Sequence, residues 1–463
     1  MRKSNLLARG ETRRTVFKGF SFDGKANTLW GNAAASSNCE IDKGELRTGA
    51  GGELQPLGGF GEVMFTSLNF DVQAIFSTPH IVGDTETQKL GVLTSGGMVS
   101  LYDSADGYLK MAYSFGEGMR MLLARNLSGD AVIIFYGEKG AFVHTKQGTP
   151  ASMGVNTASF AACFFQGRAF IGKLPHKLLF SAPYEPTHYD VSIDDGGEID
   201  LPQETGNVVG MFSMKNKVFL LYEYGIAMLE TGGSAREFRV KKLSYDGGKI
   251  FGSSAGVVGL GGEKAFFLAE DGLYVFNGAY AKRICAYLPI SPIRGTQVCN
   301  HVEFEGKYFL QYEDEIYGKR GVIIDAETEE GYFAFTATGL QNYEGRGVCI
   351  FDKAVRMLKT DGALPSGEEY VFVAQKLSLG NAGKKTVVAL EITGFGEMEL
   401  ILGNGKIEKK FALTFPENGG VCKVLPRLRG EAFSLTIKLK KGASVREIAA
   451  VTEVCKGVKG GGY

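Results

Sequence analysis

Histidines are the first residues to examine for chemistry, because an imidazole serves as a base, a proton shuttle or a metal ligand. The chain has five, and no two lie within two to four residues of each other, so no metal-binding pair is encoded locally: His80, His144, His176, His188 and His301. The densest polar group surrounds His188 and Tyr189, shortly before Asp194 and Asp195. Its composition favours a surface loop. We therefore expect no catalytic, cofactor-binding or metal-binding residue.

Glycine-rich runs and paired carboxylates are the next candidates. Residues 252–256 and 259–262 are rich in glycine, but neither run precedes a helical pattern, and a phosphate cradle needs the amides of a helix N-terminus. The acidic runs at residues 313–315 and 327–330 fit polar turns at loop tips. Two acids about 5–9 Å apart, on strands of different repeat units, could still serve a glycosidase. Sequence spacing leaves that alternative open.

The cysteines and the apolar segments bound the class of protein. Seven cysteines are scattered without a Cys-x-x-Cys pair, which favours reduced thiols buried as small apolar side chains. No window approaches the 18 apolar residues of a membrane span, and the N-terminal residues lack the apolar core of a signal peptide. We expect a chain that is made in a cytoplasm and needs no cofactor and no membrane.

Charge is unevenly distributed along a chain whose formal net charge is zero. Residues 1–20 carry six basic side chains against one acid, and residues 366–463 carry 15 Lys/Arg against 10 Glu. The middle of the chain, residues 21–365, has no basic excess. This argues against extensive nucleic-acid binding, because phosphate contacts come mainly from Lys and Arg. We predict partner contacts by the basic arm, by the single tryptophan and by the polar loop: Arg2, Lys3, Arg9, Arg13, Arg14, Trp30, His188 and Tyr189.

The elements that would position these residues are short strands in a repeating pattern. Residues 265–269 and 273–276 are apolar runs joined by Glu270-Asp271-Gly272, and Asp-Gly between apolar runs predicts a hairpin. Similar groups of strands recur, and their turn residues Gly167, Asn216, Gly262 and Gly306 are 49, 46 and 44 residues apart. A period of about 40–50 residues with three or four strands per unit predicts a β-propeller. A series of β-sandwiches is the alternative.

The order of these patterns predicts an all-β chain with four parts. Residues 1–70 form an N-terminal extended arm with a hairpin at residues 36–48, and residues 71–362 form a six- or seven-bladed β-propeller. A Gly/Pro/Ser-rich linker then leads to a C-terminal β-sandwich at residues 368–455, and residues 456–463 form a flexible tail.

A family resemblance spans most of the chain. Residues 165–171, residues 179–189 and the hairpin at residues 266–274 follow one another as in the virion β-propellers of tailed bacteriophages, and residues 38–47 are similar to the opening of that family. The resemblance implies a structural protein of the phage neck or tail, such as a hub, an adaptor or a channel-closing component of the DNA-stabilisation type. This chain departs from the pattern at His188-Tyr189, where the family usually has an acidic residue and Trp.

From these patterns we predict a non-enzymatic virion protein in the tail or neck. Its expected partners are other tail or neck proteins and further copies of itself around the tail axis, with incidental contact to packaged DNA. Two other classes stay open: a tail-associated receptor- or glycan-binding protein, including a glycosidase, and a cellular propeller that serves as an interaction hub.

Overall fold

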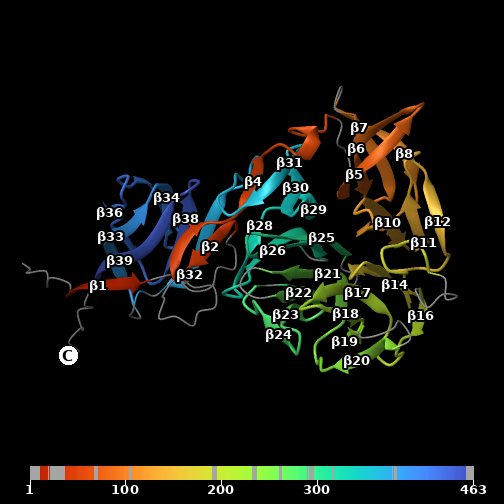
Figure 1. The fold of residues 1–463 in the computed structure, drawn as a ribbon. Helices are drawn as coiled ribbons and strands as arrows, with labels where there is room; N and C mark the ends of the chain where they lie inside the picture. The colour runs from red at the N-terminus through yellow and green to blue at the C-terminus, as the bar shows by residue number, and fades with distance from the viewer. Residues whose placement is uncertain are drawn as a thin grey trace, which may run out of the picture.

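The protein is built almost entirely of β-strands (Figure 1). The computed structural model describes residues 11–18, 20, 37–66, 71–103, 107–189, 196–231, 237–259, 263–288, 290, 297–314, 317–377, 379 and 383–454. The one helix in these ranges is a single 3-10 turn, η1 (Gly58–Phe60). Among the described residues, no helix is long and apolar enough to cross a membrane.

Seven four-stranded antiparallel sheets follow one another along the chain, and we number them sheets 1 to 7. Sheet 1 contains β5 (Val72–Val82), β6 (Thr85–Thr94), β7 (Met98–Asp103) and β8 (Tyr108–Ser114). Sheet 2 contains β9 (Arg120–Arg125), β10 (Ala131–Gly137), β11 (Gly140–His144) and β12 (Pro150–Val155). Sheet 3 contains β13 (Ala161–Phe165), β14 (Arg168–Lys173), β15 (Lys177–Phe180) and β16 (Gly197–Asp200). Sheets 4 and 5 contain β17 (Val208–Met214), β18 (Lys217–Tyr222), β19 (Gly225–Glu230) and β20 (Arg239–Leu243); and β21 (Ile250–Val258), β22 (Lys264–Ala269), β23 (Gly272–Phe276) and β24 (Ala281–Ile284).

Sheets 6 and 7 complete the series. They contain β25 (Gln297–Phe304), β26 (Lys307–Asp314), β27 (Gly318–Asp325) and β28 (Gly331–Ala334); and β29 (Thr338–Tyr343), β30 (Arg346–Phe351), β31 (Ala354–Lys359) and β4 (Gly51–Leu54). The hairpin predicted around Asp271 is confirmed, since Ala269 pairs with Gly272. In its turn Gly272 has a positive φ, 143°, whereas Glu270 and Asp271 do not.

The seven sheets form a closed ring, which is the architecture of a β-propeller. The first strands of successive sheets lie side by side in the order β5, β9, β13, β17, β21, β25 and β29, and β29 returns to contact β5. Each pair of neighbouring sheets encloses apolar side chains, such as Phe212, Phe267 and Phe276 between sheets 4 and 5. The two middle strands of sheet 5, β22 and β23, are buried on both faces, which explains their continuous apolar runs.

The ring is closed by a strand that precedes all the others in the propeller. β4 pairs antiparallel with β31, with Leu54 opposite Arg356 and Gly51 opposite Lys359. The amide oxygen of Gln341 on β29 also accepts a hydrogen bond from the backbone N–H of Ile75 on β5, at 2.7 Å. The sheet at the closing point therefore combines residues from both ends of the propeller sequence, and this sheet contacts sheet 1 through β29 and β5.

Two further sheets form a second body beside the propeller (Figure 1). One has four strands: β32 (Tyr370–Leu377), β38 (Phe433–Leu439), β34 (Glu397–Gly403) and β35 (Glu408–Thr414). The other has seven strands: β2 (Cys39–Asp42), β3 (Glu45–Thr48), β39 (Ser444–Val454), β33 (Lys385–Phe395), β36 (Gly420–Val424), β1 (Glu11–Lys18) and β37 (Leu428–Gly430). Alternate residues of β33 and β38 are buried, as expected of strands with one face toward a core.

The N-terminal segment is distributed over both bodies. β1 pairs with β39, and β3 continues along the same strand through Leu46 and Arg47. The predicted hairpin is confirmed as β2 and β3, joined by Lys43 and Gly44 with φ of 49° and 83°, whereas β4 belongs to the propeller. The four-part division of the chain stays a prediction.

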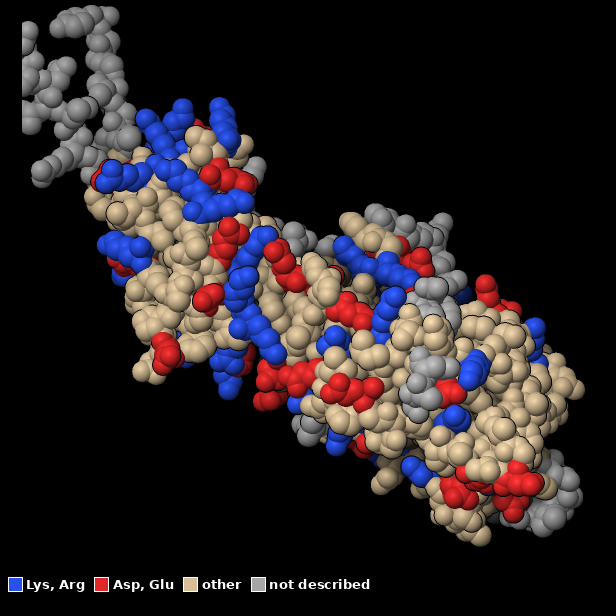
Figure 2. All heavy atoms as spheres, turned by 90° about the horizontal axis from the view of Figure 1, so that it is seen from above, with Lys and Arg blue, Asp and Glu red and all other residues tan. Residues whose placement is uncertain are grey.

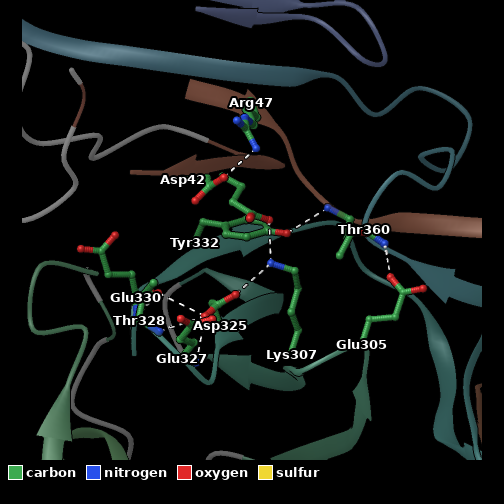
Figure 3. Close-up of polar contacts among 12 residues, drawn as sticks. Asp42, Arg47, Glu305, Lys307, Asp325, Glu327, Thr328, Glu330, Tyr332 and Thr360 are labelled. Carbon is green, nitrogen blue, oxygen red and sulfur yellow. Dashed lines mark hydrogen bonds and ion pairs between the residues drawn. The ribbon is translucent and has the colours of Figure 1, made fainter. Parts of the chain in front are cut away.

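One hydrophobic core runs through the junction of the two bodies. It joins Phe309, Tyr332 and Phe351 of the propeller to Phe372 and Leu400 of the second body. Beside it, Lys307 is 4% exposed, and its Nζ contacts Glu40 Oε2 of the hairpin at 2.8 Å and Asp325 Oδ2 of sheet 6 at 3.3 Å (Figure 3). The predicted linker is held in place as well, because the Tyr370 hydroxyl donates to the Gly362 carbonyl at 3.1 Å.

Candidate functional site

The principal cavity of the propeller lies at the end of the ring at which the first strand of each sheet starts. Its volume is about 1180 Å³, slightly above the roughly 300–1000 Å³ of ordinary ligand pockets. All seven sheets contribute to its lining. Representative residues from sheets 1 to 7 are Asp71, Arg120, Phe160, Glu223, Glu270, Gln311 and Thr338.

Local irregularities of the first strands shape this cavity. The register shifts between Val72 and Ala74 in β5, between Val208 and Gly210 in β17, and between Val298 and Asn300 in β25. β21 and β29 have similar shifts near their starts. A bulge adds an unpaired residue and re-aims its side chain. The bulges of β5 and β17 therefore place their extra residues, Gln73 and Val209, on the wall of the cavity, and Asn300, beside the irregularity of β25, lines it too.

A recurrent glutamate marks the second turn of four sheets. Glu138, Glu223 and Glu270 are the first residues after β10, β18 and β22, and Glu313 is the penultimate residue of β26. These turns lie at the same end of the propeller as the starts of the first strands, so all four side chains reach the cavity. With Asp71 and Glu117, the lining holds six carboxylates against the three cations Arg120, Lys249 and Lys319.

Two of these carboxylates are neutralised by ion pairs. Lys249 Nζ lies 3.0 Å from Glu223 Oε1, and Lys319 pairs with Asp71. Partial burial alone would raise the pKa of Glu223, but the Lys249 ammonium and the Asn207 amide outweigh that effect and lower its pKa. In the part of the chain that the structure describes, Glu117, Glu138, Glu270 and Glu313 have no ion-pair partner.

Two further polar side chains of the lining, Arg120 and Gln311, differ in their hydrogen bonding. Arg120 donates from Nη1 to the Phe160 carbonyl oxygen at 2.7 Å, which fixes the guanidinium across sheets 2 and 3. Gln311 is 2% exposed, and its Nε2 has no hydrogen-bond partner among the described residues. The cavity thus combines excess negative charge with an unused amide donor.

The residues predicted to contact partners lie elsewhere. Arg2, Lys3, Arg9 and Trp30 are outside the described residues. Arg13 and Arg14 are in β1, where Arg14 Nη2 lies 3.0 Å from Glu391 Oε2 of the same chain. His188 is exposed, and Tyr189 is partly buried with its hydroxyl bonded to the Pro186 carbonyl at 3.0 Å. Of the described residues among them, Arg13, Arg14, His188 and Tyr189 do not line the principal cavity. The contact of all eight residues with partners stays a prediction.

The acidic runs interpreted as solvated loop tips have different environments. Asp314 is 2% exposed, and Glu313 lines the cavity. Glu329 contacts Lys264 at 2.8 Å and Lys282 at 3.0 Å, and so joins sheet 6 to sheet 5. One sequence pattern indicates the cavity: a glutamate occurs at the same turn of four repeat units. The pattern points to a shared site only because the ring brings those four turns to one end of the propeller.

Buried titratable groups between the sheets have shifted pKa values but lie outside the cavity lining. Burial lowers the pKa of His301 to about 4, against a weaker opposing effect of its hydrogen bond to the Ser253 carbonyl. Burial also raises the pKa of Glu303 to about 7. Among the described residues, no group of three or more His, Cys, Asp or Glu side chains could hold a metal ion.

Comparison with known proteins finds no matching family model and no matching curated protein. Solved structures do match. Virginiamycin B lyase from Staphylococcus aureus is 10% identical, with a TM-score of 0.42 over 64% of this chain and 98% of the other. The β-propeller domain of Cps50 (Swd1) from Myceliophteria thermophila is 9% identical, with a TM-score of 0.40 over 64% of this chain and 99% of the other. Similarity at this level carries no argument about function.

Proposed function

We propose that this protein is a structural component of the neck or tail of a tailed phage or phage-like particle, where it acts as a rigid adaptor between neighbouring proteins. In this proposal the seven ring sheets are the blades of a seven-bladed propeller, and the two sheets of the second body form a β-sandwich. The sequence resemblance supplies the class of particle. The observation that carries the adaptor role is the hydrophobic core shared by the two bodies.

That core matters because two domains joined only by a linker move relative to each other. Here the apolar residues of sheets 6 and 7 belong to the same buried cluster as those of β32 and β34. The hairpin β2–β3 bridges the bodies, because β2 contacts both β28 and β32 and Glu40 pairs with Lys307. Such a body holds two binding surfaces at a fixed separation. An adaptor in a symmetric particle needs that property, since each copy must present the same geometry to its neighbours.

The surface of the second body supports contacts of its own. Figure 2 shows Lys and Arg side chains gathered over the end of the molecule that carries it. The edge strand β36 also exposes Val421 by 65%, and the adjoining Leu425 is 57% exposed. An unpaired strand edge with apolar side chains is suited to pairing with another chain.

The test is to find the chain in an intact particle. We expect mass spectrometry of purified virions to detect it in several copies, and electron microscopy to place its density on the tail axis. Recovery solely as a free monomer, with no copies in the particle, would contradict the proposal. Glycan binding on an array, or hydrolysis in a glycosidase screen, would favour the receptor-binding alternative, because a structural adaptor is inactive in both assays.

A further inference from the structure

We propose that the cavity of the propeller binds a lysine- or arginine-bearing peptide segment of a partner protein. This inference deepens the proposed adaptor function, and rests on it, because it assigns the chemistry of one partner. The occupant is a loop or chain end that carries at least two cationic side chains and inserts from the end of the ring at which the glutamate turns lie.

Charge is the first argument. Two of the six lining carboxylates are neutralised within the chain, and four have no ion-pair partner among the described residues: Glu117, Glu138, Glu270 and Glu313. They come from sheets 2, 5 and 6 and are therefore distributed around the ring. No described group of three or more potential ligands is compact enough for one metal ion. Separated carboxylates suit separated cations, such as successive basic side chains of a peptide.

The buried amide of Gln311 is the second argument and is independent of the charges. Gln311 lines the cavity, is 2% exposed, and has an Nε2 donor without an acceptor in the described structure. A buried donor left unpaired costs about 1–3 kcal/mol. The Nε2 group is a donor, so a carbonyl of a peptide bound in the cavity can accept this hydrogen bond. A simple polyamine offers no such acceptor.

The shape of the lining is the third argument. Gly96 lines the cavity without a side chain, and a Cβ there would meet only Thr94 Oγ1, at 3.8 Å. A peptide backbone can approach closely at such a position. Phe160 and Phe251 also line the cavity and are half-buried. Their rings offer apolar surface to the methylene groups of Lys or Arg while the charged ends reach the glutamates.

Binding is tested on the full chain with an acetylated and amidated hexapeptide, Lys-Gly-Lys-Gly-Lys-Gly, and with its Gln-Gly counterpart. Calorimetry at low ionic strength should show binding of the lysine peptide, and the Kd should rise with added salt because the attraction is screened. The glutamine peptide should bind at least about 10-fold more weakly. Absence of lysine-peptide binding, or equal binding of the two peptides, would overturn the proposal.

Variants locate the binding. The triple substitution E138Q/E270Q/E313Q should weaken lysine-peptide binding by about 10-fold or more, since three separated charges are lost. The matched control E408Q/E417Q/E453Q changes three exposed glutamates of the second body and should alter the Kd less than about 2-fold. An equal loss in the two triple variants would place the peptide outside the cavity and refute the inference.

Gln311→Leu separates a peptide site from a general cation site. This variant should weaken binding of the lysine peptide but leave binding of spermine unchanged, because spermine has no carbonyl to accept the hydrogen bond. Spermine binding without peptide binding would overturn the proposal. Thermal unfolding must first show that each variant is folded. A chain that is present in virions but binds no peptide would refute this inference alone, whereas peptide binding by a chain absent from virions would refute the particle role alone.

Discussion

Lys307 is a charged residue placed where the two bodies meet, and burial makes its partners indispensable. Its side chain is 4% exposed, whereas those of Glu40 and Asp325 are 23% and 31% exposed. Burial alone would raise the pKa of Asp325, but the amide of Thr328 and the Lys307 ammonium outweigh it and lower that pKa. Removing the ammonium would leave two carboxylates facing each other at the edge of the shared core (Figure 3).

We therefore predict that Lys307→Met lowers the free energy of unfolding by about 3–5 kcal/mol, the usual cost of breaking a buried pair by removing one partner. Lys146→Met is the matched control. Lys146 pairs with Glu86, and the two side chains are 54% and 48% exposed, so the loss should be below about 1 kcal/mol. Urea denaturation measures both. Equal losses of unfolding free energy in the two variants would show that the buried Lys307 pairs stabilise the junction no more than an exposed ion pair does.

His144 is the second residue whose environment gives a measurable prediction. It is 9% exposed between sheets 1 and 2, its Nδ1 shares a 2.6 Å hydrogen bond with the Tyr113 hydroxyl, and its Nε2 has no described partner. The rings of Phe76 and Phe135 pack beside it. Burial, and secondarily the charge of His80, lowers its pKa to about 4.

A histidine whose pKa is lowered on folding stabilises the folded state above its unfolded pKa of about 6.5, and this contribution is lost as the pH falls toward 4. We expect the wild type to lose about 1–2 kcal/mol more stability between pH 7 and pH 5 than His144→Gln does. Urea denaturation at the two pH values measures this difference. A pH dependence in His144→Gln identical to that of the wild type would refute the assignment.

At the scale of elements, two turn glycines share a positive φ but differ in the space available for a side chain. Gly97 lies between β6 and β7 with φ of 74°, and a Cβ there would lie 1.6 Å from the Gly116 carbonyl oxygen. The turn of sheet 1 thus packs directly against the backbone that leads to sheet 2. Gly129, between β9 and β10, has φ of 83° but no atom within 4 Å of a built Cβ.

The two glycines separate backbone strain from close packing. Gly129→Ala should cost about 1–2 kcal/mol, because an L-residue is forced into the left-handed region. Gly97→Ala should cost at least about 2 kcal/mol more, since the β8–β9 connection at Gly116 must also move. Thermal denaturation and soluble yield measure the difference. Equal destabilisation would show that the β8–β9 connection at Gly116 can move without an energetic cost.

At the scale of the whole molecule, the shared core predicts cooperative unfolding of the two bodies. Loss of the second body would expose Tyr332 and Phe351 of the propeller, and displacement of the N-terminal segment would remove β4 from sheet 7. We expect calorimetry to show a single transition whose calorimetric and van't Hoff enthalpies agree. Two separated transitions would show that the bodies are energetically independent and would weaken the case for a rigid adaptor.

The local features of the fold were predictable from the sequence because they are set by neighbouring residues. Apolar runs bounded by turn residues identified the strands near Asp271 and in the C-terminal part, and the repeat period indicated a propeller. The hairpin at Lys43-Gly44 was predicted for the same reason, since its turn chemistry lies within two residues.

Tertiary structure decided which distant residues meet. Only the closed ring brings Glu138, Glu270 and Glu313 to one cavity, because each glutamate occupies an ordinary polar turn in its own sheet. Likewise, β4 joins β31 and β1 joins β39 across about 300 residues or more, and nothing in the local pattern of a short strand specifies such a partner. The residues of a turn determine its geometry locally, whereas a cavity or a sheet closure depends on contacts that exist only once the chain has folded.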